Sequence, residues 1–269
     1  MTILIITFLS TGLISGFLAG LLGVGGGIII VPVSYFVLIS LGYSIEVVMH
    51  VSVATSLSII LFTSISSIRS HLKLGNVDKQ VIKKWFPGII IGSFFGSYLA
   101  SKINGEILVV IFSFLAFIIS INMFFQKNIK VISKDIPKSS FMNSLISGCI
   151  GFLSVLIGIG GGSFSVPTLS LFSKKMHKAV GSSAVLGLLI AFPGVISYIY
   201  LGLGIENLPP YSLGYVNILI LILVASTSIF TANLGAKTSS KIHKDKLKKI
   251  FAIFLLFTCI SLVIEHFII

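Results

Sequence analysis

Residues 16–33 read GFLAGLLGVGGGIIIVPV, and residues 151–168 read GFLSVLIGIGGGSFSVPT. When the two stretches are aligned without a gap, ten of the eighteen positions are identical. In each copy an apolar run is interrupted by Gly-x-Gly-Gly-Gly and resumes before a Val-Pro pair. A glycine costs about 1 kcal/mol in a helix interior, so three consecutive glycines predict a break in the helix. The repeat therefore predicts two matching halves, each built around a broken helix.

The composition places these breaks in a membrane. Hydrophobic residues make up 55% of the 269 residues and charged residues 10%, with a mean hydropathy of +1.12. Soluble domains carry about 25% charged residues. The apolar blocks are as long as helices and do not alternate with polar residues, which favours helices over a membrane barrel. We therefore predict an all-α polytopic membrane protein of the cytoplasmic membrane. A broken helix at membrane depth is tolerated only where it is buried in protein or lines a cavity.

The basic residues predict how the glycine segments cross the membrane. Of the 19 Lys and Arg residues, 18 fall in four loops, and only Lys102 lies apart. If each glycine segment crossed once, the charges would divide 9 against 10 between the two sides. If each segment enters and returns as a hairpin, all four loops share one side, as the positive-inside rule requires. The hairpin arrangement predicts cytoplasmic basic loops and both termini outside. The lengths leave open whether each hairpin crosses fully or is re-entrant.

The predicted architecture is two inverted repeats, each a glycine-broken helical hairpin followed by three transmembrane helices. The first repeat, residues 1–125, comprises the hairpin 3–41 and helices at 47–68, 86–101 and 106–125. A cytoplasmic linker spans residues 126–140. The second repeat, residues 141–269, comprises the hairpin 143–173 and helices at 179–201, 212–236 and 249–268. Broken helices in matching places of inverted repeats are typical of secondary transporters, whose sites lie near the bilayer midplane.

A second match follows each hairpin. The run from His50 to Ser56 aligns with the run from His177 to Ser183 at an offset of 127, so that Ala-Thr-Ser lies over Gly-Ser-Ser. Hydroxyls in these places can donate hydrogen bonds to an anion or to freed backbone groups. The simpler interpretation is that they bond to carbonyls of the preceding turn, as is common in membrane helices.

Two further side-chain types are interpreted by their positions. His50 and His177 each lie where a loop meets a helix, so interfacial solvation is the simpler interpretation and proton coupling the alternative. The single tryptophan, Trp85, follows a basic loop and is interpreted as an interface anchor.

The positions of the acidic residues limit the kinds of substrate that the predicted site could bind. The seven acids lie in loops or near helix ends, and none is left for the membrane interior. Cation sites in membranes usually place Asp or Glu there, so a metal site is not predicted, and neither is a cofactor. The basic residues lie in short loops, which indicates orientation rather than nucleic-acid binding. An anion would be held by backbone N–H groups and helix N-termini at the glycine breaks. The predicted substrate site is Gly25, Gly26, Gly27, Thr55, Ser56, Gly160, Gly161, Gly162, Ser182 and Ser183.

On these glycine and hydroxyl motifs, the sequence resembles the TauE/SafE family of sulfite-exporter-like permeases. The resemblance extends over essentially the whole chain through its duplicated layout. It implies transport of small anions, such as sulfite, organosulfonates or related sulfur-containing or carboxylate anions, across the cytoplasmic membrane. The family is usually described as having about eight hydrophobic spans in two repeats.

Several alternatives accompany this prediction. The glycines could serve only tight packing and a kink, as small-residue motifs do. A passive anion channel would use the same dipoles, and a non-transporting scaffold subunit would bind no anion. An enzyme is not predicted, because no serine has a His and Asp at membrane depth. The predicted partners are a small anion and the lipid bilayer, and association into a homo-oligomer stays open.

Overall fold

The computed structural model describes residues 2–125, 131–239 and 244–268, and in the last range the side chains of 249–265. Part of the predicted linker, residues 126–130, lies outside this description. The described chain forms ten helices and one short β-hairpin. The first half contains α1 (Thr2–Leu22), α2 (Gly27–Ser40), α3 (Ile45–Lys73), α4 (Lys79–Lys102) and α5 (Gly105–Phe125). The second contains α6 (Ser140–Leu156), α7 (Gly162–Leu171), α8 (Met176–Gly202), β1 (Ser212–Leu213), β2 (Val216–Asn217), α9 (Ile218–Thr238) and α10 (Lys244–Ile268).

Two kinds of helix start recur in the chain. The helices α3, α4, α6 and α9 begin after Ser44, Asp78, Ser139 and Asn217, whose side chains accept N–H groups of the first turn. The helices α2 and α7 begin after Gly26 and Gly161, which have no side-chain cap and adopt φ angles of 79° and 70°. Glycine enters this left-handed conformation without a Cβ penalty. The helices α2 and α7 therefore start at left-handed glycines that leave their N-termini without a side-chain cap.

Both glycine segments are buried turns. Residues 18–32 and 154–163 are buried throughout, so neither turn emerges at the surface. Gly25 lies against the Ile60 side chain, near the middle of α3, and Gly160 lies against Ile60 and Gly187, the latter near the middle of α8. The two turns therefore lie inside the bundle, where they meet.

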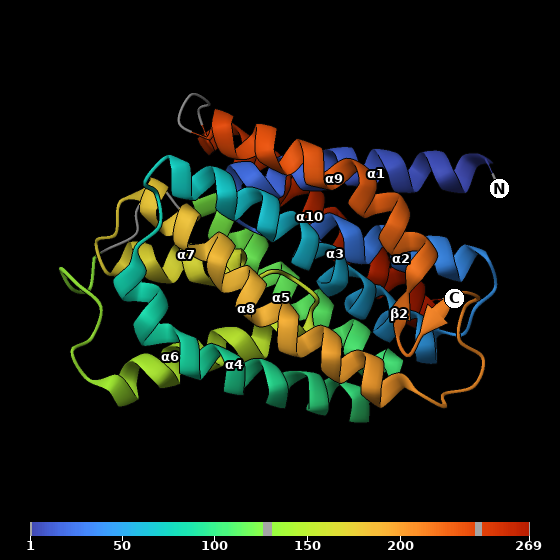
Figure 1. Ribbon diagram of the computed structural model, residues 1–269. Coiled ribbons are helices and arrows are strands. Elements are labelled where there is room, and N and C mark those ends of the chain that lie inside the picture. The colour runs from blue at the N-terminus through green and yellow to red at the C-terminus, as the bar shows by residue number, and fades with distance from the viewer. Residues whose placement is uncertain (1, 126–130, 240–243, 269) are drawn as a thin grey trace.

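The long helices pack in matched pairs. The helices α3 and α8 pack against each other, while α1 lies along α9 and α6 lies along α4 on opposite flanks (Figure 1). Close approach depends on glycine spaced every four residues: Gly12, Gly16 and Gly20 of α1 lie against the backbone of α9. Gly88, Gly92 and Gly96 of α4 lie against α6 in the same way. Such small-residue stripes let membrane helices pack with their backbones nearly in contact.

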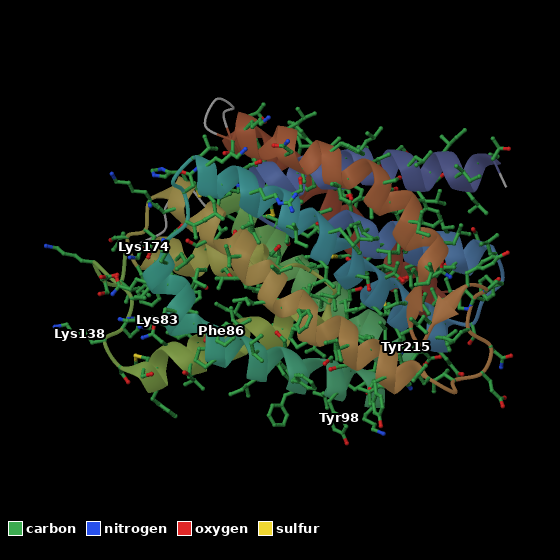
Figure 2. The ribbon with its side chains drawn as sticks, in the orientation of Figure 1. Lys83, Phe86, Tyr98, Lys138, Lys174 and Tyr215 are labelled. Atoms are coloured by element: carbon green, nitrogen blue, oxygen red, sulfur yellow. The ribbon has the colours of Figure 1, made fainter. Side chains whose placement is uncertain are left out.

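The basic loops gather at one end of the bundle. Lys83, Lys138 and Lys174 lie at this end, and Tyr98 and Tyr215 lie at the other (Figure 2). Lys73 and Lys237, at the ends of α3 and α9, line one groove. The described ends of α1 and α10 lie at the opposite end, near the marked termini (Figure 1). We call these the basic end and the terminal end.

Two expectations are corrected. The predicted helix 212–236 begins only at Ile218, because residues 212–217 form the β1–β2 hairpin and Asn217 caps α9. Trp85 is no interface anchor: it is fully buried, and its Nε1–H donates to Asn143 Oδ1 at 3.1 Å. Five described helices, α1, α3, α5, α8 and α9, are long and apolar enough to cross a membrane.

Candidate functional site

The two glycine turns are in direct backbone contact. A Cβ added to Gly25 would lie 2.8 Å from the Cα atom of Gly160, and one added to Gly160 would lie 3.0 Å from the Cα atom of Gly25. A Cβ on Gly27 would meet the carbonyl oxygen of Gly158, and one on Gly162 that of Gly23. Since no larger residue leaves room for these contacts, the glycine spacing is what allows the turns to meet.

Two of the predicted hydroxyls tie each turn to the opposite half of the chain. Ser56 Oγ, on α3, donates to the carbonyl oxygen of Gly158 at 2.7 Å. Ser183 Oγ, on α8, lies 3.1 Å from the carbonyl oxygen of Gly23 and 2.8 Å from that of Val180. The carbonyls of Gly23 and Gly158 are freed where the helices break, so these serines satisfy polar groups that cannot reach water.

The other two predicted hydroxyls hold helix starts. Thr55 Oγ1 accepts the backbone N–H of Asn217 at 2.9 Å, and Ser182 Oγ accepts that of Asp78 at 2.9 Å. Asn217 and Asp78 are the capping residues of α9 and α4. Thr55 and Ser182 are fully buried, and they bond to these loops rather than to the glycine turns. The structure therefore brings the six glycines together but gives Thr55 and Ser182 a different environment.

The first glycine turn leaves backbone donors unused. Within the described chain, the N–H groups of Gly25, Gly26 and Gly27 form no hydrogen bond. In the second turn only Gly160, of the three corresponding glycines, leaves its N–H without a hydrogen bond to the described residues, because the N–H groups of Gly161 and Gly162 donate to the Ile159 and Gly160 carbonyls at 2.6 and 2.8 Å. Free N–H groups at a helix start carry the positive end of the helix dipole. The start of α2 is therefore the more electropositive of the two turns.

A small cavity lies where the turns meet. Its volume is about 10 Å³, and it is lined by Gly23, Gly25 and Gly160 together with Ala19, Ala184 and three α3 hydroxyls, Thr63, Ser64 and Ser67. This volume is about that of one water-sized sphere, too little for an oxyanion. The structure is therefore closed around this point.

The α3 hydroxyls at the cavity are residues that sequence reasoning missed. Ser67 Oγ is buried without a hydrogen-bond partner, and Thr63 Oγ1 bonds only to carbonyls of its own helix, Ile59 and Ile60. The signal was their spacing from Ser56, since residues 7, 8 and 11 positions later share its helix face. At the 127 offset, α8 carries Ile190, Ala191 and Gly194 in the same places, so the hydroxyl row exists on one side only.

The two histidines lie elsewhere. His50 is buried: its Nδ1 lies 3.0 Å from the Glu46 carbonyl oxygen, and its Nε2 lies 3.0 Å from those of Ala100 and Ile103. Its ring stacks on Tyr215 at the terminal end. The interpretation of His50 as an interfacially solvated residue is therefore wrong. His177 is exposed at the start of α8. The hydrogen bonds and the ring contact of His50 are all to residues outside the glycine turns.

Comparison with known proteins identifies the family. The model of the sulfite exporter TauE/SafE family matches residues 8–262. This chain belongs to the TauE/SafE family. The match covers both glycine turns and nearly all of the described helices, so membership accounts for the whole fold rather than for one motif. The protein is accordingly a multi-pass membrane transporter.

Relatives from bacteria and archaea agree with the TauE/SafE assignment. A probable membrane transporter protein of Haemophilus influenzae is 35% identical over 263 residues, covering 97% of this chain and 98% of its own. One of Methanocaldococcus jannaschii is 30% identical, covering 88% and 87% of the two chains. One of Bacillus subtilis is 29% identical, covering 94% and 95%. No solved structure matches the chain significantly.

Proposed function

We propose that this TauE/SafE protein is a secondary transporter that moves small anions across the cytoplasmic membrane. The proposed substrates are sulfite, organosulfonates or related sulfur-containing or carboxylate anions, and the binding site is the crossing of the two glycine turns. One observation carries the proposal: the N–H groups of Gly25, Gly26 and Gly27 have no acceptor among the described residues, although the turn is fully buried. A buried donor without a partner costs about 1–3 kcal/mol, so a ligand that accepts from it is favoured.

The residues around the crossing of the two turns favour a negatively charged substrate. The N-terminus of a helix carries roughly half a positive charge, and two such ends, those of α2 and α7, start at the two turns. None of the residues around the cavity is acidic or basic. The α3 hydroxyls Ser64 and Ser67 add donors on one side of the anion. A cation would find no carboxylate there.

The packing supports an inverted repeat. The pairing of α1 with α9 corresponds to that of α6 with α4, and α3 and α8 pair with each other. The bonds from Ser56 to Gly158 and from Ser183 to Gly23 correspond in the same way. We propose that the two hairpins part on one side or the other, with one of these bonds broken each time, so that the site opens alternately. The cavity of about 10 Å³ then represents the closed intermediate.

The proposed mechanism is tested by transport in liposomes. Purified protein is first screened for ligands with sulfite, thiosulfate, sulfate, sulfoacetate and simple carboxylates, because a ligand that binds the native state raises its melting temperature. The best ligand is then loaded inside proteoliposomes, and counterflow of labelled ligand is measured. A transporter shows counterflow. A passive channel shows uptake without it, and a scaffold subunit shows neither binding nor uptake.

A matched pair of glycine variants tests the location of the site. Gly25→Ala places a Cβ 2.8 Å from the Gly160 Cα at a φ of +82°, whereas Gly42→Ala has a similar φ of +85° and nothing within 4 Å. Both variants carry a similar backbone strain of about 1 kcal/mol. We expect Gly25→Ala to lose at least about ten-fold in uptake and Gly42→Ala to retain it. Equal uptake by the two folded variants would place the site elsewhere.

A further inference from the structure

A groove between α3 and α9 opens at the basic end. Its volume is about 420 Å³, and three basic side chains line it: Arg69 and Lys73 of α3 and Lys237 of α9. Apolar side chains, among them Phe62, Ile65 and Ile229, also line the groove. We call this the α3–α9 groove. It lies on the outside of the bundle and is separate from the cavity at the glycine turns.

The three cations of the groove have no acidic partner in the described chain. The ion pairs of the described chain are those of Lys174 with Asp78 and Asp135, which do not line the groove. The groove also contains Asn233, whose Oδ1 accepts the Ser70 hydroxyl at 2.7 Å, which leaves the Asn233 NH₂ group as a donor. Converging Arg and Lys side chains with an amide donor suit a phosphate group, because Arg binds phosphate oxygens bidentately.

The remainder of the groove suits acyl chains. Phe62 is 46% exposed and Ile65 41% exposed, and the neighbouring Phe230 and Leu234 on α9 are 73% and 55% exposed. Large apolar side chains exposed on transmembrane helices face lipid tails in a bilayer. One groove therefore joins a cluster of three cations to an apolar wall.

The opposite groove shows that the fold does not require these charges. When α3 is aligned with α8 at the offset of 127, Arg69 and Lys73 correspond to Ile196 and Tyr200. When α4 is aligned with α9 so that Asp78 matches Asn217, an offset of 139, Lys237 corresponds to Tyr98. A groove of about 510 Å³ on α4 is lined there by Ile90, Ile91, Phe94, Phe95 and Tyr98, none of them charged; one cation, Lys102, lies with its Nζ 5.9 Å from the centre of the Tyr98 ring. The positive-inside rule explains the sign of charge at one end, but not the convergence of three cations on one groove.

We propose that the α3–α9 groove binds one anionic phospholipid, with its phosphate at Arg69, Lys73 and Lys237 and its acyl chains along Phe62 and Ile65. Basic pockets between helices on the cytoplasmic side suit such headgroups. Charge complementarity at one end and lipid-facing apolar walls at the other favour a lipid over a free anion. This site does not depend on the identity of the transported anion.

The test uses the full-length protein in neutral detergent. Phosphatidylglycerol, phosphatidylcholine, glycerol phosphate and inorganic phosphate are titrated separately, and the melting temperature and the lipids retained in native mass spectrometry are measured. We expect phosphatidylglycerol to raise the melting temperature and to be retained, and the other three to have little effect. Equal protection by glycerol phosphate or inorganic phosphate would overturn the lipid assignment in favour of a free-anion site.

Two triple variants with the same loss of charge locate the binding. R69Q/K73Q/K237Q removes the cations of the groove, and K79Q/K83Q/K175Q removes three exposed cations of the same end that do not line it. Each lost groove cation should weaken binding about five-fold, so the first variant binds phosphatidylglycerol about a hundred-fold more weakly and the second binds normally. Equal losses in both variants would overturn the proposal. If the first triple variant does not fold, the single variant Lys237→Gln carries the comparison.

Discussion

At the scale of single residues, the hydroxyls that recur in both halves hold main-chain groups of the opposite half. A broken helix in a bilayer leaves carbonyl groups that neither water nor the helix can satisfy. Ser56 and Ser183 supply the missing donors at Gly158 and Gly23, and both serines are fully buried. Each half of the chain thus stabilises the break in the other, which explains why a hydroxyl stands at matching positions after both hairpins.

Ser56→Ala should destabilise the protein more than Ser58→Ala. Ser56 bonds across the molecule to the Gly158 carbonyl, whereas Ser58 bonds at 2.9 Å to the Ala54 carbonyl of its own helix, and both are buried. Removing the cross-molecule donor leaves a buried acceptor with a lost partner, at a cost on the order of 1–2 kcal/mol. The carbonyl of Ala54 keeps its place in the helix ladder, so the second change should cost less.

Melting temperatures of the two variants in one detergent check this difference. Equal melting temperatures for Ser56→Ala and Ser58→Ala would contradict the role assigned to Ser56.

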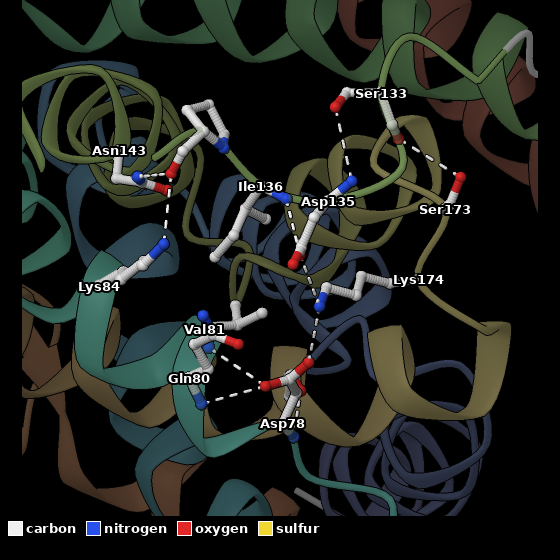
Figure 3. Close-up of polar contacts among 12 residues, drawn as sticks. Asp78, Gln80, Val81, Lys84, Ser133, Asp135, Ile136, Asn143, Ser173 and Lys174 are labelled. Carbon is white, nitrogen blue, oxygen red and sulfur yellow. Dashed lines mark hydrogen bonds and ion pairs between the residues drawn. The ribbon is translucent and has the colours of Figure 1, made fainter. Parts of the chain in front are cut away.

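At the scale of elements, Lys174 joins three loops at the basic end. Its Nζ lies 3.0 Å from Asp78 Oδ2 and 3.0 Å from Asp135 Oδ1 (Figure 3). Asp78 also caps α4 and, through its backbone N–H, bonds Ser182 of α8. The loop before α8, the start of α4 and the linker between the halves are therefore held at one point.

The charged groups of this cluster shift one another's pKa values. Burial by itself would raise the pKa of Asp78, but Lys174 and the N–H groups of Val81 and Gln80 outweigh it and lower that pKa. The hydrogen bond from Lys174 likewise lowers the pKa of Asp135. For Lys174, burial acts to lower the pKa, and the two carboxylates raise it overall. The cluster thus favours the charged form of all three groups.

Lys174→Gln should lower the stability at neutral pH by roughly 1 kcal/mol, since Asp135 is exposed and its pairing is screened by solvent. The two aspartates have lowered pKa values, so their contribution is present above the ordinary value of 3.8 and is lost as the pH falls through the lowered values. The Lys174 pKa is raised, so its contribution is present below 10.5 and is lost above the raised value.

Melting curves from pH 3 to 11 check this window. The difference between wild type and Lys174→Gln should be largest near neutral pH and vanish toward acid pH. Lys175→Gln, which removes an exposed neighbouring charge outside the cluster, should be close to wild type. A difference that persists unchanged at the lowest pH would rule out the ion pairs as its cause.

At the scale of the whole molecule, the basic loops and the described terminal helix ends lie at opposite ends of the bundle (Figure 1). The glycine hairpins produce this arrangement, because each returns to the end of the bundle from which it started. The bias of Lys and Arg toward one end then predicts that this end is cytoplasmic.

Cysteine labelling in whole cells tests this orientation. In a variant with Cys149 and Cys259 replaced by serine, single cysteines are introduced at the exposed positions Lys138, Lys175 and Glu206. A membrane-impermeant maleimide should label the cysteine at position 206 in intact cells, and the other two only after the cells are opened. Labelling of 138 and 175 from opposite sides of the membrane would contradict the arrangement of the two halves.

The sequence by itself determined the class and the location of the breaks. Hydropathy and the scarcity of charge identified a helical membrane protein, and three consecutive glycines in two copies located the turns, because both signals are local and do not depend on packing partners. The same local signals predicted a helix from 212, where Asn217 starts it later, since hydropathy reports burial and not backbone conformation.

Only the tertiary structure decided what the side chains contact. Trp85 lies beside basic residues in sequence, yet it is buried against Asn143 from a helix more than fifty residues away. The hydroxyls of Thr63, Ser64 and Ser67 became part of the crossing because Gly160, far along the chain, packs against the same face of α3. Contacts between distant segments depend on how helices cross, and a single chain's pattern of apolar and polar residues does not specify that.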